Sequence, residues 1–100
     1  MSFGSMEFPN QAIKDLCQGY RVRELSIFGS AIRGDFNAAS DVDLLVEFMP
    51  DTQVGFMTLS RMQRDLSAVF HRPVDLIPKG GLKPRIREAV LKSARVIYEA

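Results

Sequence analysis

Apolar residues recur at helical spacing in three segments of the chain. In the first, Leu16 and Cys17 follow Ile13 by three and four positions. The second and longest runs from 54 to 70 with charged residues between the apolar positions, and the third begins near Pro84, which suits the first turn of a helix. The spacing therefore predicts three helices, each with one apolar stripe to bury.

Shorter apolar runs between these segments predict four strands. The runs are ELSIFG (24–29), DVDLLVEF (41–48), VDLIP (74–78) and RVIYE (95–99). Their Val, Ile, Leu and Phe residues favour extended backbone, and glycines and prolines interrupt the chain beside them. A single helical turn is expected after Gly29, between the first two strands.

The order of these elements predicts the fold class. Helix, strand, helical turn, strand, helix, strand, helix and strand predict an α/β (α+β) domain, with about three to four helices on a small mixed or antiparallel four-stranded sheet. A chain of 100 residues is long enough for one core and too short for two, so we expect a single domain over 1–100. The order of the strands within the sheet stays open.

Composition narrows the class of protein. Hydrophobic residues make up 46% of the chain, which suits a globular domain, and a net charge of +1 gives no electrostatic reason to expect direct binding of nucleic acid. The lone Cys17 excludes an intramolecular disulfide and a cysteine-based zinc site, as in a reducing compartment. No apolar run approaches the ~20 residues of a membrane span, and the start of the chain does not resemble a signal peptide. We therefore expect a soluble, cytoplasmic protein without a membrane partner.

Three carboxylates stand in predicted strands. Asp41 and Asp43 are two residues apart, so on a strand their side chains leave the same face, and Asp75 lies inside another apolar run. Each acid alone is also explained as a turn or cap residue. Together they favour a functional site, because burying unpaired carboxylates is costly. Hard divalent cations such as Mg²⁺ prefer oxygen ligands, so the sequence predicts a metal site at these three residues.

A glycine-serine turn precedes the acid pair. Backbone N–H groups after Gly29 can point at an anion if a helical turn begins there, and the Ser30 hydroxyl adds a donor. Arg33 can contact phosphate, or can pair with Asp35 or a carboxylate of the site. An ordinary strand-to-helix turn explains the same residues when they are taken alone. Beside a metal site, they indicate the binding of a nucleotide's phosphates.

The two features together resemble a known signature. Gly29-Ser30, ten residues, and then Asp41-Val42-Asp43 are similar to the Gly-Ser-x10-Asp-x-Asp signature of the polymerase-beta-like nucleotidyltransferase superfamily. The segment GSAIRGDFNAASDVDLLVEF resembles its minimal nucleotidyltransferase (MNT) branch, and the later segment with Asp75 resembles the C-terminal half of that branch. The resemblance covers nearly the whole chain and implies the nucleotidyltransferase fold.

The resemblance also implies roles for individual residues. Asp41 and Asp43 would hold two Mg²⁺ ions, with Mn²⁺ as an alternative, and Asp75 would complete the metal site and favour deprotonation of the attacking hydroxyl. Gly29 and Ser30 would bind the β- and γ-phosphates of a nucleoside triphosphate, with ATP the expected substrate. Family members of this size are frequently antitoxins of a HEPN-domain toxin, and some transfer AMP to that toxin. A hetero-oligomer with such a partner is therefore expected.

Two other functions stay open at this stage. One is an antitoxin that neutralises its toxin by binding alone, and the other is transfer of a nucleotide to RNA or to a small molecule. A near-neutral charge and a chain too short for an acceptor-binding domain argue against the second. A chain of this size needs another molecule to present the acceptor, so we expect a protein partner to supply the hydroxyl.

Overall fold

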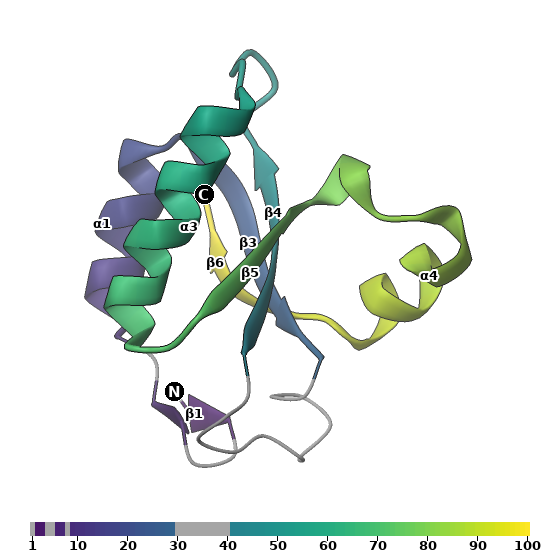
Figure 1. Ribbon diagram of the computed structural model, residues 1–100, viewed down its shortest axis with the longest axis horizontal. Helices are drawn as coiled ribbons and strands as arrows, with labels where there is room; N and C mark the ends of the chain where they lie inside the picture. The colour runs from purple at the N-terminus through teal and green to yellow at the C-terminus, as the bar shows by residue number, and fades with distance from the viewer. Residues whose placement is uncertain (1, 4–5, 8, 30–40) are drawn as a thin grey trace.

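The structure, a computed structural model, describes residues 2–3, 6–7, 9–29 and 41–100 (Figure 1). Its helices are α1 (Asn10–Gly19), α3 (Phe56–Phe70) and α4 (Pro84–Ser93), with a 3-10 turn η1 (Lys79–Gly81). Its strands are β1 (Ser2–Phe3), β2 (Met6–Glu7), β3 (Val22–Phe28), β4 (Val42–Phe48), β5 (Val74–Pro78) and β6 (Arg95–Glu99). The three predicted helices and four predicted strands are all present, and the helical turn predicted after Gly29 lies outside the described residues.

Four strands form a mixed sheet in the order β5-β4-β3-β6. β3 is antiparallel to both β4 and β6, whereas β4 and β5 run parallel. The parallel pair is joined through α3, since parallel neighbours need a crossover connection. The short strands β1 and β2 pair with each other in a separate ladder that the sequence pattern did not predict. The predicted mixed sheet is therefore confirmed.

The core lies between one face of the sheet and two helices. Figure 1 shows α1 and α3 together on this side of the sheet, with α4 on the other. Ile13 and Cys17 of α1 and Met62 and Leu66 of α3 are fully buried there. Phe56, the first residue of α3, belongs to the apolar pattern of 54–70 but is 82% exposed, unlike Met62, Leu66 and Phe70 further along the helix. No helix in the described ranges is long and apolar enough to cross a bilayer.

The opposite face of the sheet is more polar. Ser26 and Leu45, which are register partners in β3 and β4, are buried on it. Lys79 of η1 reaches over this face, with its Nζ 3.8 Å from Glu24 Oε1 and 3.7 Å from Glu47 Oε1. Because side chains alternate along a strand, Asp43 lies on the same face as Leu45. This face, with α4 beside it, holds the candidate site.

Candidate functional site

Asp43 and Asp75 lie opposite each other on neighbouring strands. They are register partners in the parallel β4–β5 pair, so their side chains leave the same face of the sheet. Both line one cavity of about 570 Å³. Asp43 is half-buried and Asp75 is exposed. The structure thus brings together two carboxylates that are 32 residues apart in sequence (75 minus 43).

The cavity lies between the polar face of the sheet and α4. Its lining combines these two carboxylates with glycine, apolar side chains and a serine: Phe28, Gly29, Asp43, Asp75, Ile77, Ile86, Ala89, Val90 and Ser93. The residues from α4 stand at positions i, i+3, i+4 and i+7, which is one side of a helix. The sequence pattern predicted that the apolar stripe of this helix would be buried, and did not show that it lines the site. Its spacing was the available signal, but a stripe facing a cavity has the same spacing as one facing a core.

Gly29 brings the backbone close to Asp43. Its φ of +79° lies in the left-handed region, which glycine adopts at little cost. A Cβ at this position would overlap Oδ2 of Asp43 and would stand 3.1 Å from its Cγ. A side chain at residue 29 would therefore displace the carboxylate. The absence of a Cβ at residue 29 therefore lets the Asp43 carboxylate lie directly against the backbone.

Asp41 does not join the other two acids. β4 begins at Val42, whose N–H donates to Pro73 O at 2.9 Å, so Asp41 precedes the strand that was predicted to contain it. Asp41 thus lies outside the strand pairing that fixes the side chain of Asp43 on one face. Asp41 is exposed and does not line the cavity. Within the ranges described, no group of three or more His, Cys, Asp or Glu side chains is arranged to hold a metal ion.

The remaining predicted site residues, Ser30 and Arg33, lie outside the described residues, and their contacts with phosphate stay a prediction. His71, the only histidine of the chain, follows the last residue of α3 in a left-handed conformation and is exposed. The basic residues that follow β5 do not line the cavity: Lys79 pairs with two glutamates, and Lys83, Arg85 and Arg87 are exposed.

The two converging acids suit a divalent cation that also binds a nucleotide. Mg²⁺ is usually held by one or two carboxylates, and substrate phosphates and water complete its six ligands. Asp43 and Asp75 supply the carboxylate oxygens, and Gly29 lines the same cavity. The residues present therefore fit a divalent cation whose other ligands are phosphate oxygens of a bound nucleotide and water.

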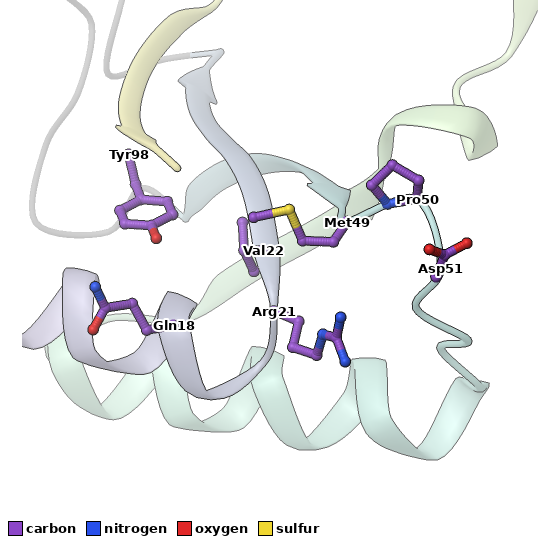
Figure 2. A pocket seen from close by; sticks show the side chains of 7 residues that line it. All are labelled: Gln18, Arg21, Val22, Met49, Pro50, Asp51 and Tyr98. Atoms are coloured by element: carbon purple, nitrogen blue, oxygen red, sulfur yellow. The ribbon is translucent and has the colours of Figure 1, made fainter.

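A second hollow, of about 440 Å³, lies at the other end of the sheet, where β3 begins and β4 ends (Figure 2). Figure 2 shows Arg21, Asp51, Gln18 and Tyr98 around it, with the Met49 side chain beside Val22. This hollow contains a single carboxylate and lacks the pair that a hard cation favours. The cavity at Asp43 and Asp75 is therefore the candidate active site.

Comparison with known proteins shows the family of the chain. The sequence pattern of the family described as "Nucleotidyltransferase domain" matches residues 9–97. The chain belongs to this nucleotidyltransferase family. A protein adenylyltransferase, MntA of Thermococcus cleftensis, is 35% identical over 85 residues, which is 85% of this chain and 82% of that protein. The chain is thus a nucleotidyltransferase, and its enzyme class, predicted from the Gly-Ser and Asp-x-Asp residues, is confirmed.

Solved structures confirm the fold. A candidate minimal nucleotidyltransferase is 32% identical, with a TM-score of 0.71 and coverage of 86% of both chains. A chain from a toxin-antitoxin crystal structure with AMP-PNP has a TM-score of 0.76 at 16% identity, covering 93% of this chain and 75% of that one. A chain from the complex of a tri-AMPylated Shewanella oneidensis HEPN toxin with MNT antitoxin has a TM-score of 0.67 at 14% identity, covering 91% and 70%. At these low identities the last two are evidence of fold alone.

Proposed function

We propose that this nucleotidyltransferase transfers AMP from ATP to a hydroxyl group of a partner protein, and that it acts as the antitoxin of a HEPN-domain toxin. The observation that carries the proposal is the register pairing of Asp43 with Asp75 beside Gly29. The similarity to a protein adenylyltransferase supports protein as the acceptor. The fold shared with chains of toxin-antitoxin complexes supports a HEPN toxin as the partner.

In this proposal the acceptor oxygen attacks the α-phosphorus of ATP. A new P–O bond forms, the bond to the bridging oxygen of the β-phosphate breaks, and pyrophosphate leaves. Divalent cations, expected to be two Mg²⁺ or Mn²⁺ ions, would supply positive charge to the attacking and leaving oxygens when bound. Asp43 and Asp75 would hold the cations. The resemblance of the signature further implies that Asp75 favours loss of the hydroxyl proton.

The remaining roles rest on the resemblance of the signature. Asp41 joins the metal ligands, which requires its carboxylate to turn toward Asp43 when nucleotide and metal are bound. Gly29 and Ser30 hold the β- and γ-phosphates through backbone and hydroxyl donors, and Arg33 adds a cation to the same phosphates. We expect the reaction to occur in the cytoplasm, where ATP is available.

The test is transfer of AMP from labelled ATP to the co-purified HEPN protein. The intact mass of that protein should rise by whole adenylyl units when it is co-expressed with this chain, and label should stay absent from RNA. The Asp43→Asn variant should abolish both the labelling of the HEPN protein and the increase in its mass. Label that enters only RNA or a small molecule would overturn the choice of acceptor.

Neutralisation of toxicity separates catalysis from binding alone. Because three carboxylates are not gathered in the described ranges, an antitoxin that only binds is the second candidate. If the Asp43→Asn variant protects cells as well as the unchanged protein does, binding is sufficient and transfer is not the protective activity. Loss of protection, with the complex still formed in a pull-down, supports the enzymatic antitoxin.

A further inference from the structure

α4 presents its apolar stripe to the site cavity instead of to the core. Ile86, Ala89 and Val90 line this cavity from one side of the helix. α4 has no buried residue, and Ile86 is 49% exposed. Surface helices normally bury such a stripe against the rest of the fold. The stripe of α4 is therefore available to contact a ligand in the cavity.

The sheet contributes a second apolar wall. Phe28, the register partner of Asp43, and Ile77, two residues after Asp75, line the cavity together with the stripe of α4. Each of these apolar side chains leaves the same face of the sheet as its neighbouring carboxylate. The cavity consequently has an acidic part and an apolar part side by side. A ligand that fills both parts needs an apolar group joined to a group that binds carboxylates through cations.

We propose that the base of the bound nucleoside triphosphate lies between the apolar stripe of α4 and the side chains of Phe28 and Ile77, while its phosphates extend toward Gly29 and Asp43. The inference rests on the proposed function and assigns the base-binding residues of the same site. Phe28 gives the cavity an aromatic side chain, the kind of group on which any nucleobase can stack. The cavity volume of about 570 Å³ falls within the roughly 300–1,000 Å³ of small-molecule sites.

One ligand fills both parts of the cavity more simply than two. An aromatic side chain of a partner protein also fits apolar walls, but it would enter separately from the phosphates. A nucleobase is covalently joined to the phosphates that the carboxylates hold through cations. Once the phosphates are bound, the base is already held next to Asp43 and Asp75, so its binding requires no further loss of translational freedom.

The test compares ATP with tripolyphosphate, each titrated with MgCl₂ into the full chain by calorimetry. Tripolyphosphate carries the phosphates without the base, so the ratio of the two affinities measures what the base contributes. ATP should bind about tenfold or more tightly than tripolyphosphate. Ala89→Leu places a larger side chain in the cavity, and it should remove this advantage while tripolyphosphate affinity stays within about twofold.

Glu88→Leu is the matched control. Residue 88 is adjacent to residue 89, is also exposed, and does not line the cavity. Its substitution introduces the same side chain on another side of α4, so both affinities should be unchanged. An affinity ratio that Ala89→Leu leaves unaltered would overturn the placement of the base.

The outcomes also separate this inference from the proposed function. Equal binding of ATP and tripolyphosphate by the unchanged protein would overturn the base site alone and leave the cavity for an acceptor side chain. Absence of magnesium-dependent binding of both would overturn the proposed function and the base site together. Hydrogen exchange gives a second readout, in which ATP, but not tripolyphosphate, should protect the amides of α4. Equal protection by both ligands would contradict the proposal.

Discussion

The carboxylate of Asp43 occupies the space that a side chain on residue 29 would need. Gly29 has a φ of +79°, and a Cβ built on it would overlap Oδ2 of Asp43. The position thus has two independent requirements for glycine, one from backbone conformation and one from contact. Both arise where β3 ends, opposite the start of β4, because Phe28 and Asp43 are register partners.

Gly29→Ala should therefore lower both stability and activity. A left-handed conformation costs an alanine about 1–2 kcal/mol, and the methyl group would push the Asp43 carboxylate away from the cavity. We expect urea denaturation to show a loss of at least that size, and calorimetry at a temperature where the variant is folded to show weakened magnesium-dependent ATP binding.

Gly19→Ala is the control for a glycine that lacks these requirements. Gly19 is the last residue of α1, and a Cβ there would have no heavy atom within 4 Å. The substitution should leave nucleotide binding unchanged and should stabilise the fold by up to about 1 kcal/mol, since alanine favours a helix more than glycine does. Equal loss of binding in both variants would contradict the role given to the contact between residues 29 and 43.

Asp75→Asn should remove activity and leave the fold intact. Asp75 is exposed, so the free energy of unfolding should change by less than about 0.5 kcal/mol. The amide is a poorer cation ligand than the carboxylate and does not accept a proton, so AMP transfer should fall by about 100-fold or more. Asp51→Asn, which removes the same charge at the opposite hollow, should transfer AMP normally. A similar loss in both variants would indicate an effect of net charge rather than of the site.

Much of the fold follows from the periodicity of the sequence. Ile13 and Cys17, like Met62 and Leu66, stand at helical spacing because each pair faces one core, and burial repeats at that spacing. The order of the strands does not follow, because alternation along a strand is the same whichever neighbour it pairs with. The pairing of β4 with β5 on one side and with β3 on the other is decided by packing of the connecting helix and by the buried face.

The site was only partly predictable for a related reason. The pair Asp43 and Asp75 was found because acids inside apolar runs are conspicuous, and the parallel register places them opposite each other. Asp41 was assigned to the same face, but the strand starts one residue later, and strand boundaries are poorly determined by composition. The cavity wall at Ile86 and Ala89 depends on the distance between α4 and the sheet, which no local pattern encodes.

Tyr20→Phe should weaken the connection between α1 and α3. The hydroxyl of Tyr20, at the end of α1, donates to Asp65 Oδ2 of α3 at 2.6 Å. Loss of this bond should reduce the free energy of unfolding by about 1 kcal/mol, measured by urea denaturation with an unchanged slope. Tyr98→Phe removes a hydroxyl at the open hollow of Figure 2 and is the matched control, with an expected change under about 0.5 kcal/mol. Equal effects of the two substitutions would contradict the role of the bond to Asp65.

Cys17 should make stability depend on pH in the alkaline range. Burial raises the pKa of its thiol from 9.0 to about 12, because the thiolate would lose its hydration in the core. Between these values the unfolded chain releases the thiol proton and the folded chain keeps it, so the unfolded state binds fewer protons and stability falls as pH rises. The loss should approach about 1.4 kcal/mol per pH unit for this group.

The Cys17→Ala variant isolates this contribution from tyrosines and lysines that titrate in the same range. Its free energy of unfolding should be lower at neutral pH, since a buried sulfur is lost, and should decline less steeply than that of the unchanged protein between pH 9 and about 11. Iodoacetamide should label Cys17 at pH 8 in urea and leave it unlabelled in the folded protein, because the buried thiol stays protonated and inaccessible. Parallel slopes in the two proteins, or rapid labelling of the folded chain, would mean that residue 17 is reached by water and that α1 does not close the core as described.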